Sequence, residues 1–199
     1  MSRLLTLVLA AVVLCASGAA VGAPEVRLGA TRSRVAEHDR LGLAAGVGSH
    51  LAALPHPLSL GWAVDLVHHA VDVHSDYNED AQVNLLCLNV LGSVGVRSTL
   101  GPIVAGLHAV GGPRFTLGSS ILIDGTPDDT GRLPPEIRGA GILVGLEVAI
   151  TGQRAGARVG WYADQAGALG NYPDILGVPF LSLDDRRVEY AIGQVTWAF

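Results

Sequence analysis

A strict alternation of side-chain character, with a period of two residues, runs through the C-terminal third of the chain. In residues 139–151 the large apolar side chains share one face: Ile142, Val144, Leu146, Val148 and Ile150. The positions between them form the opposite face: Gly141, Leu143, Gly145, Glu147 and Thr151. Successive side chains of a β-strand point to opposite faces, so a period of two predicts a strand with unlike faces.

The same period recurs in the two segments that follow. In residues 154–164, Ala155, Ala157, Val159, Trp161 and Ala163 alternate with Arg154, Gly156, Arg158, Gly160, Tyr162 and Asp164. In the last residues, Ala191, Gly193, Val195, Trp197 and Phe199 alternate with Tyr190, Ile192, Gln194 and Thr196. The second face carries small and polar side chains with few charges, which favours a crowded barrel interior over the charged outer face of a soluble sandwich.

Composition limits the alternatives. Of 199 residues, 49 % are hydrophobic and 16 % are charged, which excludes a disordered chain. The net charge is −5, and the 13 basic residues are all arginine without a cluster, so a nucleic-acid surface is not expected. The mean hydropathy is +0.40. After the N-terminus, no run of about 18 apolar residues predicts a transmembrane helix.

Extending the alternation predicts an all-β chain. The expected strands are 25–35, 40–53, 58–73, 82–98, 103–117, 136–151, 154–165 and 188–199. Their even number fits an eight-stranded antiparallel up-and-down transmembrane β-barrel. A second division treats residues 24–38 as a lead-in and places a turn at Gly111–Pro113; it also gives eight strands.

The connections between the expected strands alternate in length. Those at 54–57, 99–102 and 152–153 are short, whereas those at 72–80, 124–136 and 166–187 are long and acidic. In the preferred division all long connections lie at one end of the barrel. Short periplasmic turns and long outward loops are typical of outer-membrane barrels.

One hairpin turn sets a register and a candidate site. A two-residue turn at Gly152-Gln153 would place Thr151 opposite Arg154 and Glu147 opposite Arg158. A charge inside a narrow barrel needs a partner. We therefore predict a lumenal ion-pair network of Glu147, Arg158, Arg154, Asp65 and Asp164, filling a lumen too narrow for an open pore.

The N-terminus is typical of a secretory signal peptide. Arg3 precedes an apolar run from Leu4 to Leu14, and small residues follow. We expect residues 1–23 to be the signal peptide and residues 24–199 the barrel domain. The mature chain would then keep one cysteine, Cys87, in an apolar stretch, as a structural thiol without a disulfide.

The C-terminal pattern Val195-x-Trp197-x-Phe199 resembles the alternating aromatic signature of bacterial barrel proteins. With the signal peptide and the eight strands, the chain resembles the OmpA/OmpX-like family of small outer-membrane barrels over residues 25–199. The resemblance implies that Val195, Trp197 and Phe199 are read by the barrel-assembly machinery. It also implies a monomer among outer-membrane lipid and lipopolysaccharide. One departure is the low aromatic content of 5 %.

No residue set specifies an activity, so a non-enzymatic role in envelope integrity or surface interaction is expected. A lipid A deacylase or acyltransferase on the same scaffold would need a dyad, for which only His74-Ser75 is a local candidate. A soluble periplasmic ligand-binding barrel is the other alternative. No cofactor is assigned. No metal is assigned either, because His68 and His69 would point to opposite faces of a strand and could not share one ion.

Overall fold

The computed structural model describes residues 23–35, 38–50, 56–75, 80–123, 126–127, 140–165, 181–182 and 187–199. Eight long strands account for most of them: β1 (Glu25–Val35), β2 (His38–His50), β3 (Leu58–Ser75), β4 (Asp80–Leu100), β5 (Ile103–Ile123), β7 (Ala140–Thr151), β8 (Ala155–Gln165) and β10 (Arg187–Ala198). Two short strands complete the list: β6 (Thr126–Pro127) and β9 (Leu181–Ser182). The predicted signal peptide, apart from Ala23, lies outside the described residues.

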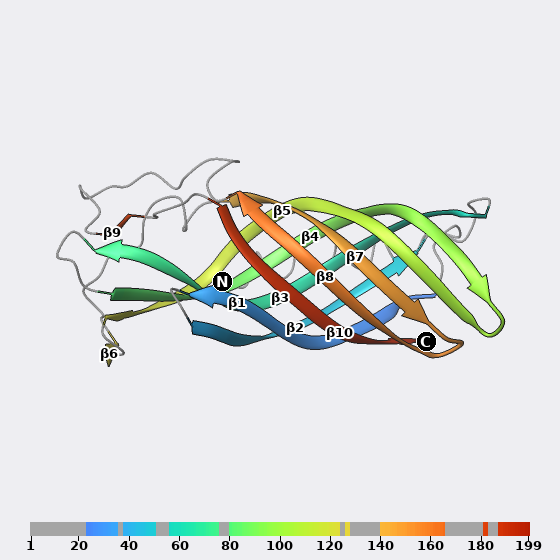
Figure 1. Cartoon of the computed structure of the whole chain (residues 1–199), viewed down its shortest axis with the longest axis horizontal. Helices are drawn as coiled ribbons and strands as arrows, with labels where there is room; N and C mark the ends of the chain where they lie inside the picture. Colours follow the sequence, from blue (N-terminus) through green and yellow to red (C-terminus); the bar gives the residue numbers. More distant parts are fainter. Residues whose placement is uncertain are drawn as a thin grey trace, which may run out of the picture.

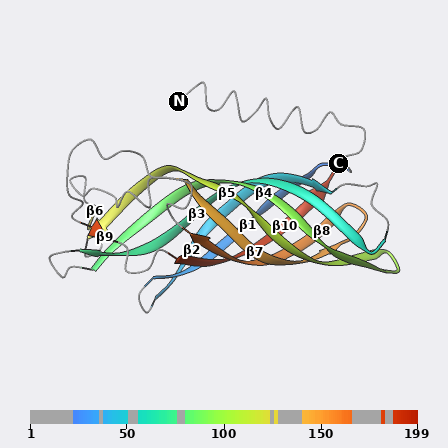
Figure 2. The ribbon, with the colours of Figure 1, turned by 90° about the horizontal axis from the view of Figure 1, so that it is seen from above.

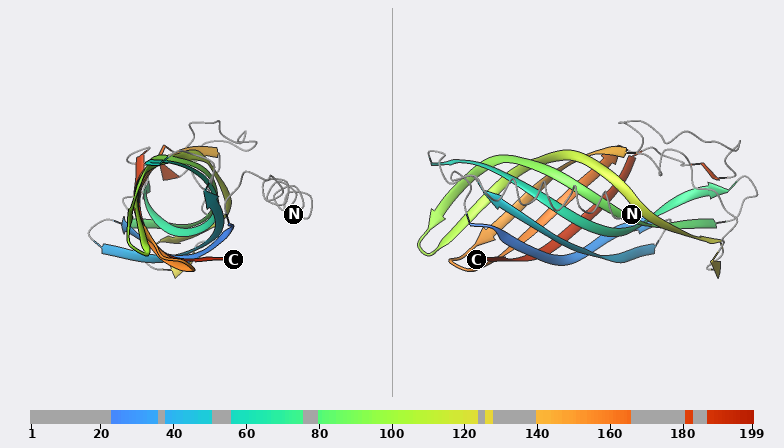
Figure 3. Two further views of the ribbon diagram at one scale, coloured as in Figure 1. Left: turned by 90° about the vertical axis from the view of Figure 1, so that its right-hand side faces the viewer. Right: turned by 180° about the vertical axis from the view of Figure 1, so that it is seen from behind.

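The eight long strands form one closed antiparallel barrel (Figure 1). The order around the sheet is β2-β1-β10-β8-β7-β5-β4-β3, and a further pairing of β2 with β3 closes it. The end-on view in Figure 3 shows the ring of strands directly. The predicted fold class, an all-β barrel of eight antiparallel strands, is confirmed, and so is the up-and-down connectivity.

The predicted strands coincide with the observed ones to within a few residues, except at the loop end of β5, which extends to Ile123. Residues 51–53 and 136–139 of the predicted strands lie outside the described residues. The second division of the sequence is wrong, because β5 continues through Gly111–Pro113 while paired with β7 along that stretch. Pro113 lies where the β4–β5 ladder is interrupted, since neither Gly112 nor Pro113 has a Cα partner in β4. A proline is tolerated within a sheet at such an irregularity.

The predicted register of the β7–β8 hairpin is wrong by two positions. Gly152 N donates to Ala155 O at 2.8 Å, so the turn residues are Gln153 and Arg154. Thr151 consequently pairs with Gly156 instead of Arg154. Moving a turn by one residue shifts the pairing by an even number, so every side chain keeps its predicted face.

The two ends of the barrel differ. At the hairpin end, β4 turns into β5 through Gly101-Pro102, where Gly101 has the positive φ of 63° required by the first position of a type II′ turn. The N-terminus of β1 and the C-terminus of β10 lie at the same end (Figures 1 and 2). At the loop end, β3, β4 and β5 extend furthest and carry β9 and β6. The predicted long acidic connections join strands at this end. Residues 72–75, 80 and 187 of these connections belong to β3, β4 and β10, residues 126–127 and 181–182 form β6 and β9, and the rest lies outside the described residues.

The two faces of the barrel wall have opposite character. Inward positions hold the buried charged and polar residues together with small, aromatic and some large apolar ones, whereas outward positions hold large aliphatic residues on every long strand. Along β7 the burial alternates residue by residue, with Leu143 and Glu147 buried and Val144 and Val148 exposed. Within the described part of the chain, no helix is long and apolar enough to cross a membrane.

Candidate functional site

The barrel interior collects the charged side chains of the wall. Seven of them are at most 5 % exposed: Glu25, Arg27, Asp65, Arg114, Glu147, Arg158 and Asp164. Each reaches the interior because it occupies an inward position of an alternating strand. A buried charge is tolerated only when it is paired and hydrogen-bonded, so the partners of these seven side chains decide how the lumen is held.

Arg158 is the centre of the larger group. Its Nη2 atom lies 2.7 Å from Glu25 Oε1, and its Nη1 atom donates to Glu147 Oε2 at 3.3 Å. The same Nη2 atom lies 2.5 Å from His50 Nε2. These contacts join β8 to β7, its neighbour in the sheet, and also to β1 and β2, which do not pair with β8. Arg158 therefore bridges the lumen from wall to wall.

The group continues from Glu25 to the other side of the lumen. Arg27 Nη2 lies 2.9 Å from Glu25 Oε1, and Arg27 Nη1 lies 3.6 Å from Asp65 Oδ2 on β3. At its other end, Tyr162 donates its hydroxyl hydrogen to Glu147 Oε1. The result is a continuous chain of alternating charges, capped by a phenol. We call it the lumenal network.

A second cluster lies nearer the loop end. Arg114 Nε is 2.7 Å from Asp164 Oδ2, and Arg114 Nη1 donates to Thr116 Oγ1 at 2.5 Å. An aromatic stack extends from the lumenal network: Tyr190 stacks on Tyr162 with ring centres 5.6 Å apart, and on His69 at 4.5 Å.

Apolar side chains fill much of the space around these rings. They include Ala44, Ala63, Val67, Leu91, Val110, Leu143 and Ile192. An eight-stranded barrel has an interior just wide enough to be filled by side chains. Ion pairs, aromatic rings and apolar side chains together fill this part of the lumen as a packed core.

The structure places four of the five predicted network residues in the lumen. Glu147 and Arg158 form the predicted ion pair. The two residues are not directly opposite each other, since the ladder partner of Glu147 is Gly160. Asp65 contacts the group through Arg27. Asp164 belongs to the second cluster with Arg114. Arg154 is exposed in the hairpin turn and outside both groups, because the turn lies one residue further along than expected.

Six members of these groups were not among the predicted residues: Glu25, Arg27, His50, Arg114, Thr116 and Tyr162. For two of them the signal was present, since Glu25 and Arg27 alternate with the outward Val26 and Leu28. Contacts such as that between Glu25 and Arg158 depend on how the barrel closes, which alternation alone does not give.

The candidate metal ligands do not converge within the described part of the chain. His69 is 1 % exposed in the lumen, whereas its neighbour His68 is exposed on the outer face. No three His, Cys, Asp or Glu side chains of the described residues are grouped to hold a metal ion. The candidate dyad His74-Ser75 lies at the end of β3, and its two side chains lie outside the described residues.

The predicted C-terminal signature lies on the outer wall. Val195 and Trp197 are 46 % and 43 % exposed, and Phe199 is 82 % exposed. Phe199 N donates to Pro24 O at 3.2 Å, which ties the C-terminus to the start of β1. Cys87, the one cysteine of the predicted mature chain, is buried and free.

Comparison with known proteins finds a likeness among solved structures. No protein-family model matches the chain, and no curated protein does. Among solved structures, the crystal structure of Neisserial surface protein A aligns with a TM-score of 0.45 and 13 % sequence identity. The alignment covers 90 % of this chain and 99 % of that one. The barrel itself is established by its own strand pairing.

Proposed function

We propose that the chain is an integral β-barrel of a Gram-negative-type outer membrane, with a closed lumen and a non-enzymatic role in envelope integrity or surface interaction. The observation that carries the proposal is the inverted distribution of side chains. Charges lie inside the barrel, and large aliphatic side chains cover its outside.

The outer face is apolar on every long strand. On β7 alone, Val144, Leu146, Val148 and Ile150 are between 53 % and 61 % exposed. Similar exposures occur around the whole ring, for example Leu107 at 52 % and Val159 at 63 %. A soluble monomer rarely exposes a contiguous apolar patch of more than a few hundred Å². A wall that is apolar all the way round fits contact with lipid acyl chains.

The height of the apolar surface also fits a bilayer. On β8 the outward positions from Ala155 to Ala163 span nine residues, or about 30 Å of strand. With the tilt of about 40° that is usual for such barrels, this corresponds to about 23 Å along the barrel axis. Outer-membrane barrels have apolar bands of about that height.

The filled lumen favours a structural or surface role and argues against a channel function. The lumenal network and the second cluster cross the interior at two levels, and aromatic rings lie between them. In planar bilayers we expect the purified barrel to give no steady ion conductance. A stable, open-channel conductance from the folded protein would contradict the closed lumen.

The location is tested by expression of the full chain in a Gram-negative host, followed by fractionation. We expect it in the outer-membrane fraction, resistant to alkaline extraction, and with a gel mobility that changes on boiling. Recovery from the periplasm without detergent would overturn the proposal.

The assembly signal is tested in the same cells with a matched pair of variants. Phe199→Ala should lower the amount of assembled barrel if Phe199 is read during assembly. Phe115→Ala removes another outward-facing phenylalanine, from β5, and should have the smaller effect. Equal amounts of assembled protein for the two variants would count against a special role of Phe199.

A further inference from the structure

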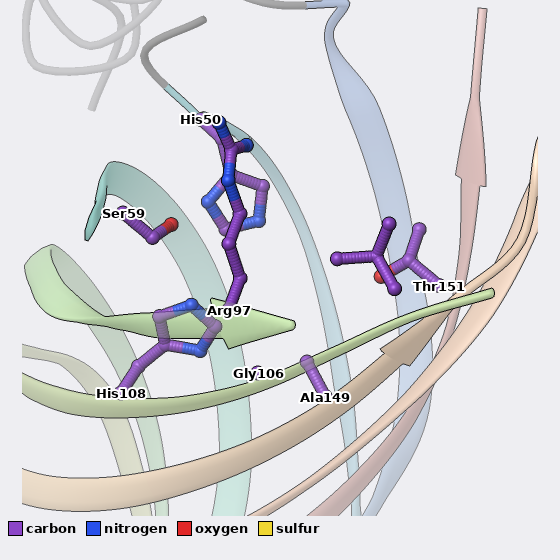
Figure 4. Close-up of a pocket in the computed structure, with 8 residues that line it drawn as sticks. His50, Ser59, Arg97, Gly106, His108, Ala149 and Thr151 are labelled. Atoms are coloured by element: carbon purple, nitrogen blue, oxygen red, sulfur yellow. The ribbon is translucent and has the colours of Figure 1, made fainter. Parts of the chain in front are cut away.

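A cavity of about 140 Å³ opens inside the hairpin end of the barrel (Figure 4). Five strands contribute to its wall, and its lining includes His50, Ser59, Arg97, His108, Ala149 and Thr151. At about 30 Å³ for each water molecule, this volume holds about five small heavy atoms. The cavity is too small for a lipid chain or a sugar and large enough for a small ion.

The His108 ring is built into this cavity by the backbone around it. His108 is 3 % exposed. A Cβ atom on Gly95 would lie 2.7 Å from its Cδ2 atom, and one on Gly106 would lie 2.6 Å from its Cε1 atom. The ring therefore occupies space that two glycines leave open. Its Nδ1 atom is buried without a hydrogen-bond partner among the described residues.

His50 presents a second polar group without a partner. Its ring stacks on His108 with centres 5.5 Å apart, and its Nε2 atom faces Arg158 Nη2. A guanidinium can only donate, so Nε2 accepts and the neutral ring carries its proton on Nδ1. That Nδ1–H group is buried and, within the described structure, has no acceptor. A protonated Nδ1 has no lone pair for a metal ion but can donate to an oxygen.

The charges around the cavity favour an anion. Arg97 is half-buried in its wall, and no carboxylate of the described residues forms an ion pair with it. The acidic groups beneath the cavity, Glu25 and Glu147, are both already paired with Arg158. Within the described part of the chain, Arg97 is thus a positive charge with no carboxylate partner, and it lies beside two imidazoles and the hydroxyls of the lining.

We propose that this cavity binds a small oxyanion, of the size and chemistry of inorganic phosphate or a short carboxylate. Arg97 supplies the charge, His108 and His50 supply ring N–H groups, and Ser59 and Thr151 supply hydroxyls. Charge-assisted hydrogen bonds of this kind are the strong ones in proteins. The proposal depends on the cavity alone and is independent of the membrane in which the barrel resides.

Isothermal titration calorimetry of the folded, detergent-solubilised barrel with inorganic phosphate tests the proposal. Saturable binding is expected, and Arg97→Gln should weaken it by about tenfold or more. Arg154→Gln is the matched control, because Arg154 is an arginine of the same barrel end that lies in the exposed turn and not in the cavity lining. It should change the affinity by less than about twofold. A boiling-dependent gel shift verifies that each variant is folded.

Titrations with acetate and with Zn²⁺ separate the possible ligands. Binding of acetate or phosphate that is lost in Arg97→Gln supports the oxyanion site. Binding of Zn²⁺ without either anion would overturn it and indicate a two-histidine metal site instead. Absence of saturable anion binding by the unmodified protein would also overturn it, as would equal weakening by Arg97→Gln and Arg154→Gln. A second variant, Thr151→Val, should weaken binding without changing the charge.

Discussion

Arg158 links more strands across the barrel interior than any neighbouring charged residue, because it has partners on three other strands. Its guanidinium pairs with Glu25 and Glu147 and contacts His50. Removing one partner of a buried ion pair leaves the others desolvated and unpaired, which costs more than the pair itself contributes. The lumenal network therefore acts as one unit.

We predict that Arg158→Gln lowers the free energy of unfolding by about 3–5 kcal/mol, since the buried Glu147 loses its ion-pair partner and Glu25 keeps only Arg27. Equilibrium unfolding of the barrel in urea, after refolding into lipid vesicles, measures this change. Arg154→Gln, in the exposed turn, serves as the control and should stay within about 0.5 kcal/mol of the unmodified protein. Similar losses in the two variants would show that the network is not stabilising.

Which residues face the lumen could largely be predicted from the sequence. Alternation gave the inward faces of Glu147, Arg158, Asp65 and Asp164, and each of them is buried. The pairing partners could not be predicted, because they depend on the stagger with which the strands close. Arg154 shows the limit: an error of one residue in the turn moves it from a buried ladder position to an exposed turn.

Close packing of adjacent strands depends on inward-facing glycines. In the pair formed by β1 and β10, a Cβ atom on Gly29 would lie 2.0 Å from Gly193 O. A Cβ atom on Gly193, which faces outward, would meet nothing within 4 Å. Backbone atoms cannot move aside as a flexible side chain can, so the two glycines differ in what they tolerate.

We predict that Gly29→Ala strongly reduces the folded fraction, whereas Gly193→Ala leaves it nearly unchanged. The two positions lie on the same strand pair, so each serves as the control for the other. The proportion of protein with the faster mobility on an unboiled gel, after refolding in detergent, measures the folded fraction. Equal tolerance of the two substitutions would mean that β1 and β10 are further apart than described.

At the scale of strands, prediction from the sequence worked for existence, order and face. All eight long strands were expected, because β7, β8 and β10 alternate clearly, and short turns or long acidic connections separate the remainder. The extension of β5 to Ile123 was missed, since the segment between 118 and 123 is rich in Gly and Ser and lacks alternation. This segment forms a strand because it pairs with β4, whereas its own composition does not favour a strand.

The whole molecule combines an apolar outer wall with a polar, filled interior. In water this arrangement would leave the aliphatic side chains of all eight long strands exposed. In a bilayer the same side chains are solvated by lipid, and the closed ring leaves no backbone edge unpaired in hydrocarbon. The environment therefore decides whether an outward charge is tolerated.

We predict that Leu146→Arg, in the middle of β7, destabilises the barrel in lipid vesicles by about 2–4 kcal/mol. Leu146 is 61 % exposed, so the same change on a soluble protein would be nearly neutral. Gln153→Arg, in the hairpin turn, adds the same side chain outside the apolar wall and is the control. An unaffected unfolding free energy for Leu146→Arg would contradict lipid contact.

Contact between the outer wall and acyl chains is tested most directly by fluorescence quenching of Trp161, which is 61 % exposed on the outer face. A variant with Trp62→Phe and Trp197→Phe leaves Trp161 as the one fluorophore of that type. Reconstituted in vesicles of brominated lipid, its emission should be strongly quenched by bromine on the acyl chains and little affected by aqueous iodide. Strong quenching by iodide, with none from the brominated chains, would show that the wall faces water and would contradict the membrane barrel.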